Sequence, residues 1–88
     1  MTEREFTVTN EFGLHARPAG QVATLAAQFE ANLEIASQNE WVSARSVLSM
    51  LSLAIGPGSL VRVRAEGPDE ENAVDAIGAL LVGLGNGH

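Results

Sequence analysis

The chain has 88 residues, 45% of them hydrophobic, and it contains no cysteine. This length supports one hydrophobic core, so we expect residues 1–88 to form a single domain, and the lack of cysteine excludes disulfides and thiolate metal sites. Five arginines against eleven acidic residues give a formal net charge of -6, the opposite of the basic footprint that nucleic-acid binding requires.

The first predicted element is a β-strand over residues 5–9, where Phe6 and Val8 alternate with polar residues. A turn over residues 10–13 follows this strand. Gly13 gives the turn its conformational freedom, so that the chain can pass directly into a helix.

A helix is predicted over residues 16–28, because apolar residues recur there at helical spacing. Its apolar stripe consists of Ala19, Val22, Ala23, Ala26 and Phe29. Pro18 lies in the first turn, where a missing backbone N–H is tolerated. This pattern predicts His15 at or beside the N-cap.

The start of this helix is a candidate anion site. Backbone N–H groups at a helix start lack intrahelical acceptors, and the helix dipole makes the position electropositive. The N–H groups of Ala16 and Arg17 are the candidate donors, and the Arg17 guanidinium can pair with phosphate oxygens. If the His15 ring is itself the nucleophile, the arrangement is a phosphohistidine site. The alternative is a surface histidine that only caps the helix.

Two strands are predicted after the first helix. Leu33 and Ile35 alternate with polar residues in one of them, and residues 41–43 form the other, short strand. The polar residues 37–40 between them predict a turn.

A second helix is predicted over residues 46–53, with Ser46 as its cap and Gly-Pro-Gly at residues 56–58 as its stop. Its apolar residues are too many for one core-facing stripe, so some are expected at the surface. Met50 and Leu53 are assigned to the core. The predicted partner-docking patch beside His15 consists of Val47, Leu48 and Leu51.

The remaining elements are a strand and a helix. The strand is marked by Leu60, Val61 and Val63, and Gly-Pro at residues 67–68 ends it. Asp69 is predicted to cap the last helix, with Glu70 and Glu71 in its first turn. The apolar stripe of that helix consists of Ala73, Val74, Ile77, Leu80, Leu81 and Leu84. His88 is expected to be a terminal surface residue and not a ligand.

The resulting order βαββαβα predicts an α+β fold. Right-handed connections around one core favour a four-stranded antiparallel sheet with three helices on one face. Arg62 and Arg64 alternate on the last strand, and we interpret them as solvated or ion-paired residues of a sheet face and not as an RNA contact.

Residues 13–20, Gly-Leu-His-Ala-Arg-Pro-Ala-Gly, resemble the active-site signature of the HPr family. These proteins are the histidine-containing phosphocarriers of the bacterial phosphoenolpyruvate-dependent phosphotransferase system. Residues 43–51 resemble the family's regulatory-serine region, and the order of elements matches over essentially the whole chain. The resemblance implies an open-faced β-sandwich. It also implies that His15 accepts a phosphoryl group on Nδ1 from phosphorylated enzyme I and passes it to a histidine of an EIIA-type acceptor.

The resemblance also implies a regulatory role for Ser46. In some members an HPr serine kinase/phosphorylase modifies the serine at this position, so that kinase is a candidate partner. Phosphorylation would add about 1.5 to 2 negative charges beside the docking patch.

The sequence combines features of two branches of the HPr family. Thr24 and Ala27 stand where many sugar-transport members carry basic residues, and Phe12 and residues 67–71 resemble the nitrogen-related branch. Arg45 before Ser46 instead resembles the kinase-regulated members. The branch, and with it a role in sugar transport, stays open.

We therefore predict a stoichiometric phosphocarrier and not an enzyme, because phosphoryl transfer depends mainly on positioning and charge stabilisation. We expect no cofactor and no metal, and no nucleic-acid partner. We also expect no membrane insertion, a cytoplasmic location and a monomer. The alternative is a regulatory interaction module of a nitrogen-type branch that signals by its phosphorylation state. A small-ligand-binding α+β domain is a third hypothesis, for which the sequence offers no pocket signature.

Overall fold

The computed structural model describes residues 1–9 and 13–83. Its elements, in chain order, are β1 (Thr2–Thr7), α1 (Ala16–Ala26), β2 (Asn32–Ser37), β3 (Glu40–Ser43), α2 (Val47–Ser52), β4 (Leu60–Glu66) and α3 (Glu70–Gly83). The predicted turn at residues 10–12, including Phe12, lies outside the described residues, as do Leu84 and His88.

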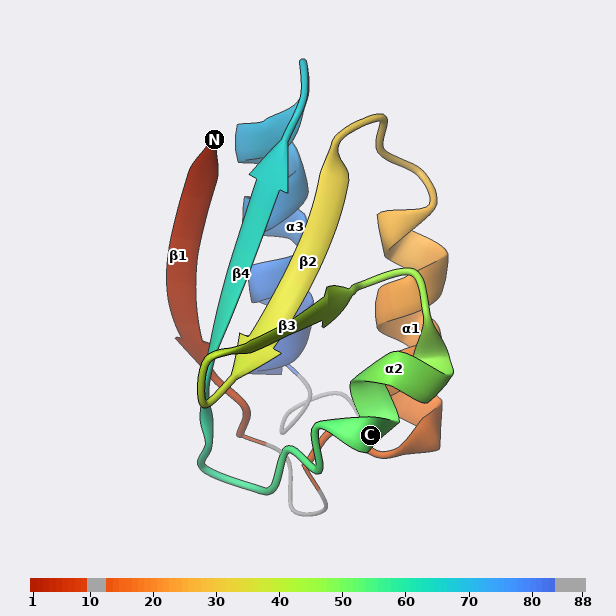
Figure 1. Ribbon diagram of the computed structural model, residues 1–88, viewed down its shortest axis with the longest axis vertical. Helices are drawn as coiled ribbons and strands as arrows, with labels where there is room; N and C mark the ends of the chain where they lie inside the picture. Colours follow the sequence, from red (N-terminus) through yellow and green to blue (C-terminus); the bar gives the residue numbers. More distant parts are fainter. Residues whose placement is uncertain (10–12, 84–88) are drawn as a thin grey trace.

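The four strands form one antiparallel sheet in the order β1-β4-β2-β3. Figure 1 shows α3 behind the strands, and α1 with α2 to one side of them in this view, so that the sheet face turned toward the viewer stays open. The predicted α+β architecture, a four-stranded antiparallel sheet covered by three helices, is confirmed.

The core lies between the sheet and the helices, and alternation along β4 shows how the sequence builds it. Val61, Val63 and Ala65 are buried, whereas Arg62 and Arg64 between them face outward. The helices contribute Ala19, Val22 and Ala26 from α1 and Ala73, Val74, Ile77 and Leu81 from α3. The described residues of the two predicted apolar stripes therefore lie on the core-facing sides of these helices.

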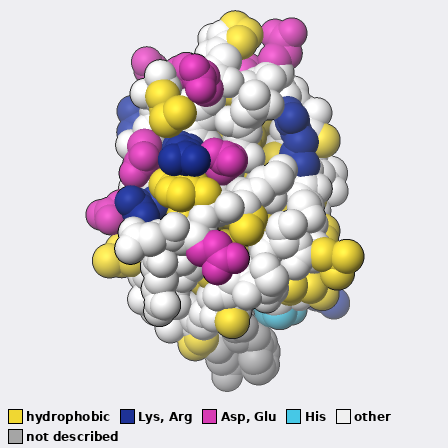
Figure 2. Space-filling model, in the orientation of Figure 1, with side chains coloured by type: hydrophobic (Ala, Val, Ile, Leu, Met, Phe, Trp, Pro, Cys, Tyr) yellow, Lys and Arg dark blue, Asp and Glu magenta, His cyan; other side chains and the backbone are white. Residues whose placement is uncertain are grey.

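The open sheet face is polar and ion-paired. The Arg64 guanidinium lies 3.8 Å from the centroid of the Trp41 ring and donates to Glu34 at 2.7 Å. Arg62 lies 5.1 Å from the same centroid and pairs with Glu3 at 3.8 Å. Figure 2 shows basic and acidic side chains gathered around hydrophobic atoms on this face. The interpretation of both arginines as ion-paired sheet residues is confirmed.

The predicted bounds of the first strand are wrong. β1 runs from Thr2 to Thr7 and not over residues 5–9, and Thr2 pairs with Ala65 at its far end. Its early residues alternate poorly because β1 is an edge strand whose side chains are mostly exposed. Pairing with β4 thus extends the strand where hydrophobic alternation gives no signal.

The predicted end of the first helix needs correction, and Asp69 at the start of α3 makes contacts beyond the predicted cap. α1 ends at Ala26, with Ala27 as its C-cap, and does not reach residue 28. Asp69 precedes α3 as predicted, but its carboxylate accepts hydrogen bonds from the N–H groups of Glu30 and Ala31, at 2.9 and 2.8 Å. These bonds hold the α1–β2 turn against the start of α3, because that turn has backbone donors of its own to satisfy.

Candidate functional site

His15 is the N-cap of α1, in an extended conformation with φ -89° and ψ -169°. Its carbonyl oxygen accepts the N–H of Ala19 at 3.0 Å, which is the first hydrogen bond of the helix. The side chain is exposed and does not cap the helix with a hydrogen bond of its own. The predicted placement at the helix start is therefore confirmed, and the ring lies at the protein surface.

Two backbone donors precede the first helical hydrogen bond. The N–H groups of Ala16 and Arg17 have no carbonyl one turn earlier in the helix to accept them, and Pro18 has no N–H. Both Ala16 and Arg17 are exposed. Together with the helix dipole, these groups form a positively polarised surface next to His15, where an anion is stabilised.

The segment before His15 is held in place by contacts with the backbone of Ile55. Gly13 has a φ of +69°, and a Cβ at this position would overlap the carbonyl oxygen of Ile55. The N–H of Leu14 donates to that same oxygen at 2.9 Å, while the Leu14 side chain is buried in the core. The brace fixes the backbone that presents the imidazole.

Arg17 differs from the other arginines in its surroundings. Arg4, Arg62 and Arg64 form ion pairs with carboxylates, and Arg45 donates to backbone carbonyl oxygens. Within the part of the chain that the structure describes, no carboxylate or carbonyl oxygen is bonded to the Arg17 guanidinium. This exposed cation, two residues from His15, is available to pair with phosphate oxygens.

Ser46 is the N-cap of α2, as predicted. Its Oγ accepts the N–H of Ser49 at 3.2 Å and lies 2.9 Å from the Ser49 hydroxyl. This cap satisfies one of the N–H groups in the first turn of α2 that have no acceptor within the helix.

The three residues of the predicted docking patch differ in their exposure to solvent. Leu48 is 81% exposed, whereas Val47 and Leu51 are half-buried and pack against the core. Met50 is fully buried, as expected, and Leu53 is half-buried. Figure 2 shows the histidine side chain next to a group of hydrophobic atoms at one edge of the molecule.

Among the residues that the structure describes, the acidic side chains belong to segments other than these two helices. Neither α1 nor α2 contains an aspartate or glutamate. The described acidic residues lie instead on the strands, in the α1–β2 and β4–α3 turns and along the first half of α3. The surface formed by α1 and α2 therefore has no carboxylate of its own to repel an anion.

Sequence reasoning missed the role of Arg45. Its guanidinium donates to the carbonyl oxygens of Ala26, Phe29 and Ala31, at 3.3, 2.5 and 3.2 Å. These carbonyls lie at and after the end of α1, where a cation is favoured by the helix dipole. The residue before Ser46 thus joins the start of α2 to the end of the helix that carries His15.

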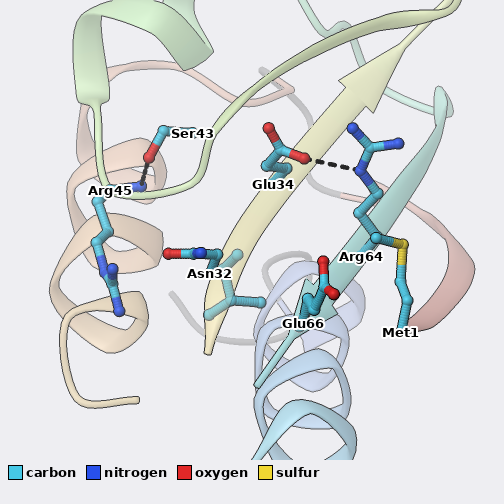
Figure 3. Close-up of a pocket in the computed structure, with 9 residues that line it drawn as sticks. Met1, Asn32, Glu34, Ser43, Arg45, Arg64 and Glu66 are labelled. Atoms are coloured by element: carbon cyan, nitrogen blue, oxygen red, sulfur yellow. Dashed lines mark hydrogen bonds and ion pairs between the residues drawn. The ribbon is translucent and has the colours of Figure 1, made fainter. Parts of the chain in front are cut away.

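A hollow of about 300 Å³, partly lined by Arg45, lies at one end of the open sheet face. Figure 3 shows Asn32, Glu34, Arg64 and Glu66 around it, with the Glu34–Arg64 pair closed and Arg45 turned toward the end of α1. None of the predicted site residues lines this hollow, and its arginines are already engaged.

Among the described residues, no group of three histidine, cysteine, aspartate or glutamate side chains is placed to hold a metal ion. In the same part of the chain, no helix has the length and apolar character needed to cross a membrane.

Comparison with known proteins gives one family. Residues 2–82 match the family described as "PTS HPr component phosphorylation site". The chain is 37% identical over 81 residues to the phosphocarrier protein HPr of Cupriavidus necator, covering 92% of this chain and 91% of that protein. It is also 42% identical over 79 residues to the phosphocarrier protein NPr of Shewanella violacea, covering 90% and 87%.

Solved structures agree with these sequence matches. The HPr crystal structure from Thermoanaerobacter tengcongensis superposes with a TM-score of 0.93 at 33% identity, covering 100% of this chain and 99% of that one. The phosphocarrier protein HPr from Bacillus anthracis superposes with a TM-score of 0.87 at 35% identity, covering 91% and 95%.

Proposed function

This chain belongs to the HPr family of phosphocarrier proteins of the phosphotransferase system, and we propose that His15 is the residue that carries its phosphoryl group. The observation that carries this proposal is the position of the exposed imidazole as the N-cap of α1, directly before the N–H groups of Ala16 and Arg17. A phosphoryl group bonded to this ring lies where the helix start favours negative charge.

The proposed step is a direct phosphoryl transfer. A lone pair on Nδ1 of the His15 ring attacks phosphorus, and the bond between phosphorus and the donor group of enzyme I breaks. The Arg17 guanidinium and the two backbone N–H groups stabilise the charge on the phosphoryl oxygens during transfer. In the second transfer, a ring nitrogen of a histidine of an EIIA-type acceptor attacks phosphorus, and the bond between phosphorus and Nδ1 of His15 breaks, which returns His15 to its unphosphorylated form. The chain contributes positioning and electrostatics, which dominate this chemistry.

The partners are proteins that reach an exposed surface. Leu48 provides exposed apolar area on α2, the helix that packs against α1, with Val47 and Leu51 half-buried next to it. The proposed carrier works as a cytoplasmic monomer, because enzyme I and the acceptor must each reach His15 in turn. The function needs no nucleic acid and no cofactor.

Labelling tests this proposal. Incubation with phosphoenolpyruvate and active enzyme I is expected to place one acid-labile, alkali-stable phosphoryl group on the chain. His15→Ala is expected to remove this label. His88→Ala is the matched control, because it removes the other histidine and is expected to keep the label. Label that persists in His15→Ala, or that is absent from the parent chain with active enzyme I, contradicts the proposal.

A second candidate function is regulation through Ser46. The Ser46 hydroxyl bonds to the N–H and the hydroxyl of Ser49, so a phosphate at Ser46 would replace a neutral cap with about 1.5 to 2 negative charges. That charge would lie directly before Val47 and Leu48, and it would alter docking on α2. The proposed modifying partner is an HPr serine kinase/phosphorylase.

Binding measurements separate the two functions. A pull-down with unmodified, His15-phosphorylated and Ser46-phosphorylated chain compares the proteins that each form captures. A pure carrier binds only transfer partners, whereas a regulatory module of a nitrogen-type branch captures a further kinase, transporter or transcription factor in one phosphorylation state. Identical capture by all three forms rules out the regulatory role.

A further inference from the structure

Ser49 carries a hydroxyl that the cap of α2 does not require. That cap is the 3.2 Å hydrogen bond from the backbone N–H of Ser49 to Oγ of Ser46, and alanine at position 49 would keep the same N–H. Serine favours a helix less than alanine does, because its hydroxyl competes for backbone groups. In a helix of six residues, the Ser49 hydroxyl therefore has a cost that the cap does not offset.

The Ser49 hydroxyl is bonded to the hydroxyl of Ser46. The two oxygens lie 2.9 Å apart, with Ser46 as the donor, and both side chains are half-buried. Within the described residues, no other group is bonded to the Ser49 hydroxyl. Ser52, one turn further along α2, donates its hydroxyl to the carbonyl oxygen of Ser49 at 2.6 Å. Of these two serines of α2, Ser49 is the one that contacts Oγ of Ser46.

We propose that Ser49 is a positioning residue for a phosphate at Ser46, and this inference rests on the proposed modification of Ser46. In that modification, Oγ of Ser46 forms a bond to the γ-phosphorus of a nucleoside triphosphate. The bond from that phosphorus to its bridging oxygen breaks, which releases the nucleoside diphosphate, and the Ser46 proton passes to the kinase. Ser46 then has no proton to donate. The Ser49 hydroxyl rotates about its Cβ–Oγ bond and donates its own proton to a phosphate oxygen, which lies one P–O bond beyond Oγ.

The bond from Ser49 fixes the phosphate and also affects its charge. A hydrogen-bond donor favours the more negative form of a phosphate, so the Ser49 hydroxyl lowers the second pKa of the phosphoserine. The dianion is then favoured at neutral pH. It is held directly before Val47 and Leu48, where it alters docking on α2 most strongly.

The charged groups around α2 stay unchanged when Ser49 is replaced. Arg45 directly precedes the cap residue, and its guanidinium is bonded to carbonyl oxygens near the end of α1. The elements that pack against α2 are α1, which carries Arg17 and has His15 as its N-cap, and β3, which carries Glu40. A change in the phosphate titration on replacing residue 49 therefore reports the loss of the hydroxyl.

Titration of the phosphate tests the proposal. Phosphoserine is incorporated directly at position 46 of the full chain, and phosphorus-31 NMR follows its second ionisation between about pH 4 and pH 9. Ser49→Ala is expected to raise the midpoint by about 0.3 pH units or more, because the phosphate loses a donor. Ser49→Thr keeps a hydroxyl and is expected to stay within about 0.1 pH units of the parent chain. Ser49→Ala is compatible with the fold, because the capping N–H remains and alanine favours helix, and a Tm at or above the parent value checks this.

The matched control is Ser52→Ala, which removes a hydroxyl from the same helix without touching Ser46. It is expected to leave the midpoint unchanged. A parent-like midpoint in Ser49→Ala, or an equal rise in Ser52→Ala, overturns the inference. Failure of an HPr serine kinase/phosphorylase to modify Ser46 of the parent chain instead contradicts the regulatory function itself, and the titration does not depend on that enzyme.

Discussion

The backbone of Gly13 lies directly against the carbonyl group of Ile55. The following residue, Leu14, donates its N–H to the same oxygen at 2.9 Å, so that oxygen both holds the segment before His15 and limits the space at Gly13. The two contacts join the α1 start to the segment after α2. The presentation of the imidazole therefore depends on a residue 40 positions away from it.

Gly13→Ala is expected to destabilise the protein by about 2 to 4 kcal/mol. An alanine must adopt the φ of +69° and its Cβ must displace backbone atoms of Ile55 and Gly56. Urea denaturation measures the change. Gly20→Ala is the control, since it adds the same methyl group in open helix and is expected to stabilise by about 0.5 to 1 kcal/mol. Equal effects of both substitutions would contradict the proposed brace.

Arg17→Ala is expected to slow phosphoryl transfer by about 100-fold while changing the free energy of unfolding by about 0.5 kcal/mol or less. The side chain is exposed and forms no ion pair with another described residue, so the fold does not depend on it. Arg17→Lys keeps the charge but loses the planar pair of donors, and an intermediate rate is expected. Rapid-quench measurement of phosphohistidine formation gives these rates, and parent-like kinetics of Arg17→Ala would remove Arg17 from the mechanism.

Arg45→Ala is expected to lower the free energy of unfolding by about 2 kcal/mol, because three carbonyl oxygens near the end of α1 lose their charged donor. Arg4→Ala is the matched control. The pair that Arg4 forms with Asp75 is exposed on both sides, and such pairs contribute about 1 kcal/mol or less. Chemical denaturation of both variants is the measurement, and an equal loss in the two would show that Arg45 is only a surface charge.

The contacts of the Glu70 carboxylate are expected to make the free energy of unfolding decrease at acid pH. The N-terminal ammonium, the Thr2 hydroxyl and the N–H of Gly67 all donate to its carboxylate, and they lower its pKa from 4.5 to about 2. The unfolded chain takes up a proton at Glu70 before the folded chain does. The contribution is therefore complete above pH 4.5 and is lost as the pH falls through about 2.

Glu70→Gln is expected to flatten this part of the profile of unfolding free energy against pH. Glu71→Gln is the control, because it removes a carboxylate from the same helical turn but leaves the three donors to Glu70 in place. Denaturation between pH 2 and pH 6 gives the profiles. A parent-like slope in Glu70→Gln would show that these contacts do not stabilise the folded chain.

Much of the local structure can be read from the amino-acid order. The N-cap positions of His15 and Ser46, the proline in the first turn of α1 and the apolar stripes of α1 and α3 depend on residues three or four positions apart. Patterns over so few residues can be recognised in the sequence without knowledge of the tertiary structure. The motif at residues 13–20 likewise indicates the family and, with it, a candidate phosphohistidine.

Contacts between residues that are distant in the sequence depend on the tertiary structure and could not be predicted from the sequence alone. Asp69 bonds to backbone N–H groups 38 and 39 positions before it, and Arg45 reaches carbonyl groups 14 to 19 positions before it. The pairing of Thr2 with Ala65 sets where β1 begins. No periodicity links such residues, because their approach follows from the packing of the helices on the sheet.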